Sequence, residues 1–334
     1  MHLKTLLAGL SLRSATADME TEITRISYDS RTTAPGDVFV AMTGFAADGH
    51  AYIGKAMAAG AAAVVCERPP EDSSVPYVLV ENSRRALAVM AANYYGHPAD
   101  SMTMVAVTGT NGKTTTTYLL KAILEQELGA KVGLIGTNQD LIGDEVVPTE
   151  RTTPESLELQ ELFARMRSAG CTHVVMEASS HALALDRVYG IHYAVGIFTN
   201  LTQDHLDFHK TMEAYCDAKA ILFQNCDVGV CNADDPWTER LLQNATCRRY
   251  LYAEHAAADL RAENILLAAD HIAFDAVTKD GRTPIKVGIP GGFMVYNTLD
   301  VLGAALALGV PLEKSARALS TVPHVKGRRS EERR

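Results

Sequence analysis

A strand, a glycine-rich turn and the start of a helix follow one another directly in the segment Val105-Ala-Val-Thr-Gly-Thr-Asn-Gly-Lys-Thr-Thr-Thr116. In such an arrangement, successive backbone N–H groups and the helix dipole surround a phosphate. The segment departs from the G-x-x-x-x-G-K-[ST] pattern, because Val107 occupies the place of the first glycine. Lys113 would supply charge and Thr114 the hydroxyl that binds Mg²⁺. We expect a nucleotide-phosphate site formed by Gly109, Thr110, Asn111, Gly112, Lys113, Thr114 and Thr115.

Predicted strands and helices alternate after this turn. The apolar stripe Leu119, Leu120, Ile123, Leu124 and Leu128 predicts a helix over 113–128 that packs on a sheet. Further strands are expected at 132–135, 172–176, 194–198, 228–231 and 249–252, with helices at 154–168 and 211–224. This alternation is typical of an α/β domain with a mainly parallel sheet flanked by helices. Strands near 271–277 and 284–289, followed by helices at 295–308 and 312–319, indicate an antiparallel extension.

A second, smaller α/β module precedes the glycine-rich turn. Its predicted strands lie at 37–42, 62–66 and 77–80, and its predicted helices at 51–59 and 84–95. The breaker Gly96-His-Pro-Ala-Asp100 separates the modules. With 334 residues, the chain has room for two domains. We expect an N-terminal domain over 1–97, a central domain over 98–325 and a charged tail over 326–334.

Composition and terminal patterns indicate a soluble, cytoplasmic protein. The first 18 residues resemble a signal peptide, but Arg13 interrupts the pattern, and Leu3, Leu6, Leu7 and Leu10 have the spacing of a short amphipathic helix. No apolar run reaches the length of a membrane span. A formal charge of -9 disfavours a nonspecific nucleic-acid binder. The six cysteines form no C-x-x-C pair and are expected to be reduced thiols. We expect a monomer.

Three polar residues are candidates for a catalytic or metal-binding role. Glu177 follows a predicted apolar strand, so it would emerge at the carboxyl edge of the sheet, where it could bind Mg²⁺. His205 follows another predicted strand, but a histidine in a turn needs no function. Lys219 lies in a predicted helix, where a lysine is by default solvent-exposed. Thr153 and Pro154 have the pattern of an N-cap followed by the first helical residue.

Several motifs in order resemble the Mur ligases, in particular the UDP-N-acetylmuramoyl-tripeptide synthetase branch. They are Gly109-Thr-Asn-Gly-Lys-Thr-Thr115, Glu150-Arg-Thr-Thr-Pro154, Met176-Glu-Ala-Ser-Ser-His181 and Phe198-Thr-Asn-Leu-Thr-Gln-Asp-His-Leu-Asp-Phe-His209. In the first module, Asp29-Ser-Arg31, Pro35-Gly-Asp-Val-Phe-Val40 and Gly44-Phe-Ala-Ala-Asp-Gly49 are similar to the branch's UDP-sugar domain. The resemblance covers about residues 20 to 328.

The resemblance implies an ATP-dependent ligase of peptidoglycan synthesis. It would activate a carboxylate of UDP-N-acetylmuramoyl-L-alanyl-D-glutamate as an acyl phosphate and join it to a diamino acid, with meso-diaminopimelate favoured over L-lysine. The resemblance makes Lys113, Glu177, His205 and Lys219 catalytic. Thr114, Glu177, His205 and a carbamylated Lys219 would be the Mg²⁺ ligands. By the same resemblance, Ser30, Thr152, Thr153, Ser179 and Arg187 would bind the muramyl substrate, Asn297 adenine and Arg328 the ATP phosphates.

The sequence departs from the family at two places. Met294 stands where the family has the first of two asparagines, so that only Asn297 remains. The family also has a third domain that binds the incoming amino acid, and this sequence stops before it. We therefore expect weak or absent ligation from the chain by itself. Two alternatives remain at this point: a nonenzymatic UDP-muramyl-peptide binder, and a ligase like the folylpolyglutamate synthetases, which share the glycine-rich turn.

Overall fold

The computed structural model describes residues 1–44, 48–149 and 151–322. Within these ranges the chain divides into two compact units. Unit 1 contains Met1–Pro98, Pro154–Ala164 and Leu185–Gly190, and unit 2 contains Ala99–Thr153, Arg165–Ala184 and the chain from Ile191 on. Two segments from the middle of the sequence thus belong to unit 1. Arg328, the charged tail over 326–334, Glu150 and Phe45 to Ala47 of the quoted motifs lie outside the described residues.

Unit 1 is built on a mostly parallel sheet. Its described strands lie in the order β1-β5-β4-β3-β2, and β1 alone among these five pairs antiparallel with its neighbour. The strands are β1 (Leu12–Ala15), β2 (Ile26–Ser27), β3 (Val38–Val40), β4 (Ala63–Cys66) and β5 (Tyr77–Val80). Along β4, Ala63 and Val65 pack into one hydrophobic cluster, while Val64 and Cys66 pack into another. Because successive residues of a strand point to opposite faces, both faces of this sheet are covered.

The helices of unit 1 agree with the predicted ones except at their ends. They are α1 (Leu3–Leu6), η1 (Gly49–Tyr52), α2 (Ile53–Ala58) and α3 (Ser83–Tyr95), with η2 (Pro98–Ser101) at the end of the unit. The expected amphipathic helix is confirmed but short, and Leu10 lies beyond its end. The side chain of Asn82 caps α3 by accepting hydrogen bonds from the N–H groups of Arg84 and Arg85, and Gly96 ends it at φ 67°.

Unit 2 contains one large sheet. Its described residues form eleven strands in the order β16-β15-β14-β13-β12-β11-β6-β10-β7-β8-β9. The run from β14 to β7 is parallel, and antiparallel strands extend it at both ends. The strands are β6 (Thr103–Thr108), β7 (Val132–Ile135), β8 (Asp140–Ile142), β9 (Glu145–Val147), β10 (His173–Glu177), β11 (Tyr193–Phe198), β12 (Cys226–Asn232), β13 (Arg248–Ala253), β14 (Leu260–Leu267), β15 (Ile272–Thr278) and β16 (Gly281–Val287). The expected antiparallel extension is confirmed.

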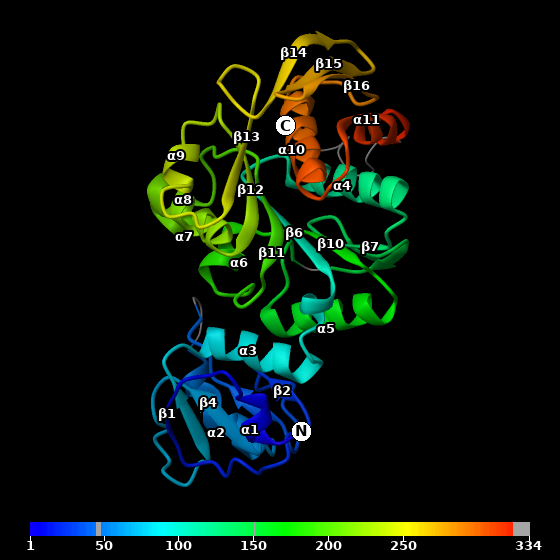
Figure 1. The fold of residues 1–334 in the computed structure, drawn as a ribbon. Helices are drawn as coiled ribbons and strands as arrows, with labels where there is room; N and C mark the ends of the chain where they lie inside the picture. The colour runs from blue at the N-terminus through cyan, green and yellow to red at the C-terminus, as the bar shows by residue number, and fades with distance from the viewer. Residues whose placement is uncertain (45–47, 150, 323–334) are drawn as a thin grey trace. The chain divides into compact units, whose positions relative to one another are not determined.

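Helices cover both faces of this sheet. The described helices of unit 2 are α4 (Lys113–Leu128), α6 (Ser180–Ala184), α7 (Leu206–His209), α8 (Met212–Ala220), η3 (Ile221–Gln224), α9 (Thr238–Leu241), α10 (Phe293–Ala307) and α11 (Leu312–Thr321), whereas α5 (Ser156–Ser168) belongs to unit 1 as far as Ala164 and to unit 2 from Arg165 on. A Cβ added at Gly229 would meet Phe223 of η3, whereas Gly303 of α10 approaches Val230. Since neighbouring strand residues face opposite sides, η3 and α10 lie on opposite faces of β12. Helices α4, α10 and α11 contact one another (Figure 1).

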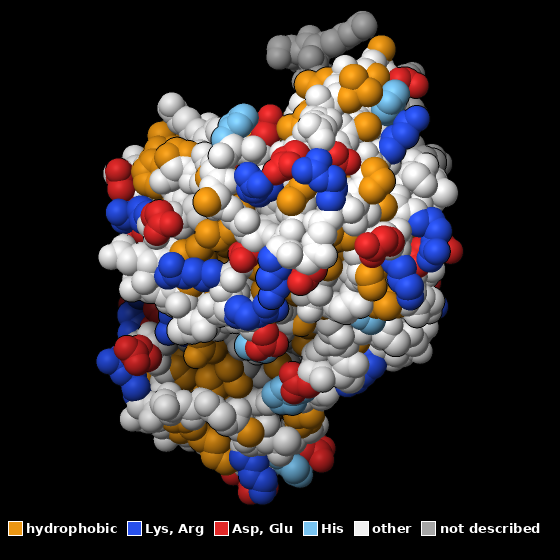
Figure 2. All heavy atoms as spheres, turned by 45° about the horizontal axis from the view of Figure 1, so that its top comes forward, with side chains coloured by type: hydrophobic (Ala, Val, Ile, Leu, Met, Phe, Trp, Pro, Cys, Tyr) orange, Lys and Arg blue, Asp and Glu red, His pale blue; other side chains and the backbone are white. Residues whose placement is uncertain are grey.

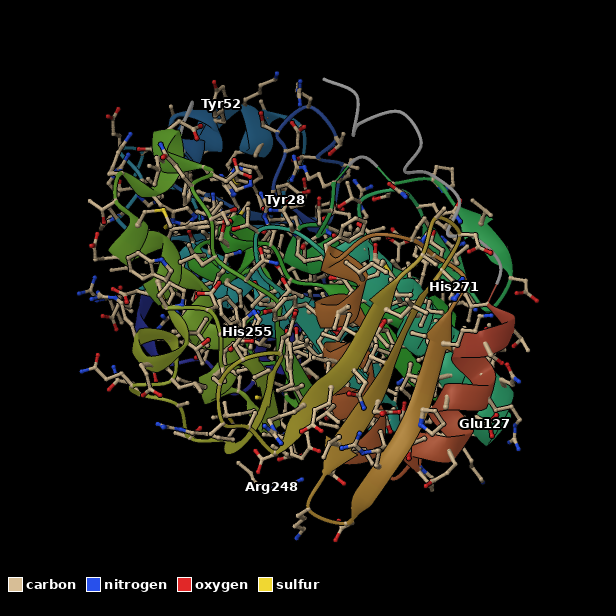
Figure 3. All side chains as sticks on the ribbon, turned by 90° about the horizontal axis from the view of Figure 1, so that it is seen from above. Tyr28, Tyr52, Glu127, Arg248, His255 and His271 are labelled. Carbon is tan, nitrogen blue, oxygen red and sulfur yellow. The ribbon has the colours of Figure 1, made fainter. Side chains whose placement is uncertain are left out.

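Helix α4 anchors the sheet to its covering layer. Leu119, Leu120, Ile123 and Leu124 are fully buried as predicted, but Leu128 is 45% exposed, because the helix ends there at the left-handed Gly129. At the same end, Arg317 of α11 donates to Glu127, whose side chain is almost fully buried. Figure 3 shows Glu127 beside α11 and the strands β14 to β16 side by side. The apolar stripe therefore positions α4 rigidly behind the turn that precedes it.

On the face drawn in Figure 2, Lys and Arg side chains are interspersed with Asp and Glu side chains. Within the described ranges, no helix is long and apolar enough to cross a membrane. All six cysteines are free thiols, and five of them are buried.

Candidate active site

The glycine-rich turn joins β6 to α4. Gly109 has φ 147° and Gly112 has φ 91°, backbone conformations that side chains rarely adopt. A Cβ added at Gly109 would lie 1.9 Å from Oγ1 of Thr199, and one added at Gly112 would lie 2.4 Å from Oδ1 of Asn297. Both positions therefore require glycine because of backbone conformation and close packing together. The loop over residues 109–112, here called the phosphate loop, is held tightly from two sides.

The segment after β11 holds the phosphate loop in place. The backbone N–H of Thr110 donates to the carbonyl oxygen of Asn200 at 2.8 Å, and that of Asn111 donates to the Asn200 side chain at 3.0 Å. The Asn111 carbonyl accepts from Oγ1 of Thr199 at 2.6 Å, and Thr202 N donates to Thr110 Oγ1 at 3.0 Å. Two of the N–H groups expected to face a phosphate thus bind Asn200 instead.

The first turn of α4 supplies the remaining donors. The N–H groups of Lys113, Thr114 and Thr115 lie in the first helical turn, where no helical carbonyl can accept from them. Nζ of Lys113 donates to the carbonyl oxygens of Gly109 at 3.1 Å and Thr110 at 2.8 Å, so the ammonium group lies across the phosphate loop. This combination of N–H groups, helix dipole and lysine suits a phosphate.

Glu177 is the last residue of β10, next to β6 in the sheet. It is fully buried, and three donors hold its carboxylate. Oγ1 of Thr114 donates to Oε1 at 2.8 Å, the Thr137 N–H donates to Oε1 at 3.1 Å, and Oγ1 of Thr137 donates to Oε2 at 2.9 Å. A Cβ added at Gly136 would lie 2.6 Å from Oε1. The carboxylate is therefore fixed beside the first turn of α4, where the sequence predicted it.

A chain of hydroxyl groups continues from Glu177. Oγ1 of Thr137 lies 3.0 Å from Oγ1 of Thr152. Thr153 donates from Oγ1 to the Glu177 carbonyl at 2.8 Å and accepts from the Ser179 N–H at 3.2 Å. Ser179 Oγ accepts from the Ala182 N–H at 3.2 Å, and so caps α6. The predicted N-cap role of Thr153 is wrong, because α5 begins at Ser156 and the Thr153 side chain binds the end of β10.

Lys219 is buried, with 1% of its surface exposed, and does not lie on a solvated helix face. Its Nζ donates to the Gly109 carbonyl at 2.9 Å and lies 4.5 Å from the centre of the Tyr215 ring. The same carbonyl accepts from Lys113, so two lysine side chains converge on one oxygen. Burial, and then the nearby Lys113 charge, hold the pKa of Lys219 well below 10.5. Helix α8 thereby places a buried amine against the phosphate loop.

His205 belongs to a cluster of rings beside Tyr215. It adopts φ 52°, and its half-exposed ring stacks edge-on against His181, with centroids 5.0 Å apart. His205 and Tyr215 have centroids 6.1 Å apart. Nearby, burial and then the charges of His181 and Lys219 lower the pKa of His209 to about 4. His205 and Lys219 therefore both lie beside the Tyr215 ring.

Only some of the four residues predicted to bind Mg²⁺ contact one another. Thr114 and Glu177 are hydrogen-bonded, whereas His205 and Lys219 share Tyr215 as a neighbour. In the part of the chain that the structure describes, no group of three or more His, Cys, Asp or Glu could hold a metal ion. Mg²⁺, however, is usually bound by one or two protein groups together with substrate phosphates and water. A hydroxyl and a carboxylate beside a phosphate loop fit that requirement.

Asn297 lies behind the phosphate loop rather than on an open surface. It is 4% exposed, its Oδ1 approaches Gly112, and its Nδ2 contacts Sδ of Met294 at 3.9 Å. Met294, the departure from the family pattern, is also buried. In unit 1, Ser30 is buried after β2, and Arg187 forms an ion pair with Glu155 at 3.3 Å. Contacts between Asn297 and adenine remain a prediction.

Sequence reasoning missed several residues that shape this site. Gly136 and Thr137 follow β7, and Thr199 and Asn200 follow β11. All four stand just beyond the carboxyl ends of strands in the parallel part of the sheet, where α/β folds gather their functional groups. The positions of the predicted strands would have singled them out. Tyr215 had no such signal, because its role depends on where α8 packs.

Comparison with known proteins agrees with this geometry. Residues 107–305 match the model of the Mur ligase middle domain, and residues 22–95 match that of the Mur ligase family catalytic domain. The UDP-N-acetylmuramoyl-L-alanyl-D-glutamate--2,6-diaminopimelate ligase of Clostridium botulinum is 45% identical over 332 residues, which cover 98% of this chain and 68% of that protein.

Two solved structures show the same fold. A UDP-N-acetylmuramoyl-L-alanyl-D-glutamate--2,6-diaminopimelate ligase superposes with a TM-score of 0.84 at 24% identity, covering 98% of this chain and 68% of that one. Folylpolyglutamate synthetase from Lactobacillus casei superposes with a TM-score of 0.55 at 17% identity, covering 70% of this chain and 66% of that one. The second likeness leaves out much more of the chain. From the two matched domains and the curated relative, the chain belongs to the Mur ligase family, whose members are ATP-dependent ligases.

Proposed function

We propose that this chain acts in the ATP-dependent addition of 2,6-diaminopimelate to UDP-N-acetylmuramoyl-L-alanyl-D-glutamate during peptidoglycan synthesis. The relative at 45% identity carries this activity in its name. The observation that supports the proposal most directly is the buried Glu177 carboxylate, fixed by Thr114 and Thr137 beside the phosphate loop. The chain spans 68% of the length of that relative.

ATP would bind with its phosphates against residues 109–115. The N–H groups in the first turn of α4 point at that position, and Lys113 would move from the loop carbonyls to a phosphate oxygen. Bound Mg²⁺ would neutralise phosphate charge, which is the main requirement of phosphoryl transfer. Thr114 and Glu177 are the residues we assign to hold it, because their hydroxyl and carboxylate already lie 2.8 Å apart. We assign His205 to a second Mg²⁺, while Asn297 and Arg328 remain candidates for adenine and phosphate contacts.

Lys219 would act as a carbamate. A lysine reacts with carbon dioxide through its neutral amine, and both burial and the Lys113 charge favour that form by lowering the pKa of Lys219. The carbamate is an anion, so it would be attracted by the Lys113 charge that disfavours a protonated Lys219. The contact between Lys219 and the Gly109 carbonyl places this group at the phosphate loop.

We assign five polar residues to the muramyl substrate. Thr152, Thr153 and Ser179 lie along the hydroxyl chain that starts at Glu177, so they are suited to contact the peptide near the carboxylate to be activated. Ser30 would contact the uridine end, and Arg187 a carboxylate. The name of the relative favours meso-diaminopimelate over L-lysine as the diamino acid. We further propose a monomer that works in the cytoplasm, in keeping with its free cysteines.

Ligand titrations test this function. ATP with Mg²⁺ and UDP-N-acetylmuramoyl-L-alanyl-D-glutamate should each bind the chain, as measured by calorimetry, and a folate substrate should not. Glu177→Gln should weaken the Mg²⁺ dependence of ATP binding and leave ATP binding without Mg²⁺ almost unchanged. With both ligands and meso-diaminopimelate present, the chain by itself should release phosphate only weakly. Tight folate binding without muramyl-peptide binding would refute the proposal.

A further inference from the structure

Two cysteines of unit 2 are neighbours at the amino ends of adjacent strands. Cys226 is the first residue of β12, and Cys247 directly precedes β13, which pairs parallel with β12. The Cys226 thiol donates a hydrogen bond to Sγ of Cys247. A Cβ added at Gly196 would lie 3.0 Å from Sγ of Cys226, and one added at Gly229, which pairs with Gly196, would lie 2.8 Å from Sγ of Cys247. The two residues are called the Cys226–Cys247 pair below.

Backbone contacts hold the Cys226–Cys247 pair together. Thr246, which precedes Cys247, donates from its N–H to the Phe223 carbonyl at 3.2 Å and from its Oγ1 to the Gln224 carbonyl at 3.2 Å. Both acceptors belong to η3, which ends two residues before Cys226. The segments that carry the two thiols are therefore fastened directly to each other.

The strand register places the Cys226–Cys247 pair within reach of a disulfide bond. Val228 lies opposite Arg248, so the same register extended by one residue sets Cys247 opposite Asp227, one position from Cys226. With strands about 4.8 Å apart and a rise of about 3.3 Å per residue, the two Cα atoms would be separated by about 6 Å. Disulfide-linked cysteines usually have Cα atoms at this separation.

The two thiols differ in exposure and in acidity. Cys226 is 4% exposed, whereas Cys247 is only half-buried. The hydrogen bond that Cys226 donates, together with the nearby Arg249 charge, holds the pKa of Cys247 below 9.0. The same hydrogen bond and burial raise the pKa of Cys226. Because the thiolate is the reactive form of cysteine, Cys247 is the nucleophile of the pair and Cys226 the second thiol beside it.

We propose that the Cys226–Cys247 pair is a redox-active dithiol, which a small organic disulfide such as glutathione disulfide oxidises to an internal disulfide. The Cys247 thiolate would attack one sulfur of glutathione disulfide and release one glutathione thiolate. Cys226 would then lose its proton, attack Sγ of Cys247 in the mixed disulfide and release the second glutathione. The pair thus gives up two protons and two electrons, and one glutathione disulfide is reduced to two thiols. An accessible, acidic thiol next to a second thiol is typical of redox-sensing cysteines.

The disulfide would join two strands whose carboxyl ends support the phosphate loop. Asn232, the last residue of β12, donates from Nδ2 to the Thr199 carbonyl at 3.0 Å, and the Tyr252 hydroxyl of β13 donates to the Phe198 carbonyl at 3.0 Å. Thr199 in turn binds the phosphate loop. The bond would also close a loop over residues 226–247, which includes α9. Oxidation should therefore stabilise this part of unit 2 against unfolding.

Counting thiols in the full chain tests the inference. The folded chain is incubated with glutathione disulfide, its remaining thiols are counted after denaturation, and linked peptides are identified by mass spectrometry. The parent chain should lose two of its six thiols and yield one peptide pair joined through Cys226 and Cys247. Dithiothreitol should restore both thiols. Cys171→Ser, which removes another buried thiol of unit 2, should leave this result unchanged.

Substitutions of the two cysteines separate their roles. Cys226→Ser keeps a hydroxyl donor beside Cys247, so this variant should lose one thiol and stop at the mixed disulfide with glutathione. Cys247→Ser should lose none, because Cys226 is buried. The corresponding alanine variants serve if a serine variant does not fold. Cys231→Ser should form the same disulfide as the parent chain.

Urea unfolding followed by the fluorescence of Trp237, which lies within the closed loop, tests the structural consequence. The folding equilibrium constant should be about 10- to 100-fold larger for the oxidised parent chain than for the reduced one, and unchanged by the same treatment in Cys226→Ser. Four results would overturn the inference: no thiol loss in the folded parent chain, loss of two thiols in Cys247→Ser, a disulfide that includes Cys231, or an oxidised chain less stable than the reduced one. None of them bears on the proposed function, on which this inference does not rest.

Discussion

At the scale of single residues, Gly109 is the position where the phosphate loop tolerates least change. Its φ of 147° is nearly restricted to glycine, and an added Cβ would lie 1.9 Å from Thr199 Oγ1. We expect Gly109→Ala to displace the loop from Thr199 and to lower ATP affinity by more than about tenfold, measured by calorimetry, because the loop places the phosphate donors.

Gly129 provides the matched control for this prediction. It also has positive φ, 62°, but an added Cβ would meet nothing within 4 Å. Gly129→Ala should therefore cost about 1 kcal/mol of stability through backbone conformation, and leave ATP affinity unchanged. Equal effects of the two substitutions on ATP binding would show that the contact with Thr199 is unimportant.

Lys219 makes stability depend on pH in a defined direction. Because the pKa of Lys219 is lowered on folding, the unfolded chain binds more protons than the native chain between that lowered pKa and 10.5. The free energy of unfolding should therefore rise with pH in this window. At pH values below the window, the destabilisation caused by burying Lys219 is at its full size. In carbon dioxide-free buffer, urea unfolding of Lys219→Met should lack this rise. Lys4→Met, at a side chain 54% exposed, should retain it; parallel curves for the parent and Lys219→Met would contradict the prediction.

The candidate site could be predicted from sequence where one local pattern specifies it. Lys113 and Glu177 were predicted because a glycine turn and a strand end mark them. Lys219 was taken from residues alone as solvent-exposed, because its burial depends on Tyr215 and Gly109, which are distant in sequence. Thr137 and Asn200 follow predicted strands and could have been singled out by position, but their hydrogen-bond partners could not, because these lie on other strands whose order the sequence does not state.

At the scale of elements, the hairpin after β7 carries a second pH effect. Asp140, the first residue of β8, is 3% exposed, and burial raises its pKa from 3.8 to about 6 despite a hydrogen bond from the Gly136 N–H. The native chain thus binds more protons than the unfolded chain between pH 4 and 6. Stability should fall as pH rises through that window, by up to about 3 kcal/mol. Asp140→Asn should remove this fall in chemical unfolding, and an unchanged pH slope would contradict the assignment.

The parallel strands were predictable and several others were not. A strand such as β12, buried on both faces, appears in sequence as an apolar run. In contrast, β9 is largely exposed, and β14 is buried only at its start, because Leu266 and Leu267 are more than half exposed. Strand β9 pairs antiparallel with β8, and the exposed end of β14 pairs antiparallel with β15, so that pairing with a neighbour rather than burial defines these strand segments.

At the scale of the whole molecule, the chain has separate hydrophobic cores. The clusters of unit 1 surround β3, β4 and β5, while a different cluster in unit 2 surrounds β6, α4 and α10. The phosphate loop, Glu177 and Lys219 belong to unit 2, whereas Ser30 and Arg187, which we assign to the muramyl substrate, belong to unit 1. A ligand that binds the native form stabilises the part of the chain that it requires to be folded. The two ligands should therefore act on different parts of the unfolding curve.

We expect ATP with Mg²⁺ to stabilise unit 2 selectively. At about 100 times its dissociation constant, it should add about 2.7 kcal/mol to the unfolding free energy of that unit. Trp237, the only tryptophan of the chain, lies in unit 2, so its fluorescence reports on this transition, while circular dichroism reports on both units. Amide hydrogen exchange should slow in β6, β10 and β11 and stay unchanged in β3 to β5. Gly109→Ala should abolish the shift. Equal protection of both units, or one transition common to both probes, would show that their cores unfold together and that the division into two stability units is wrong.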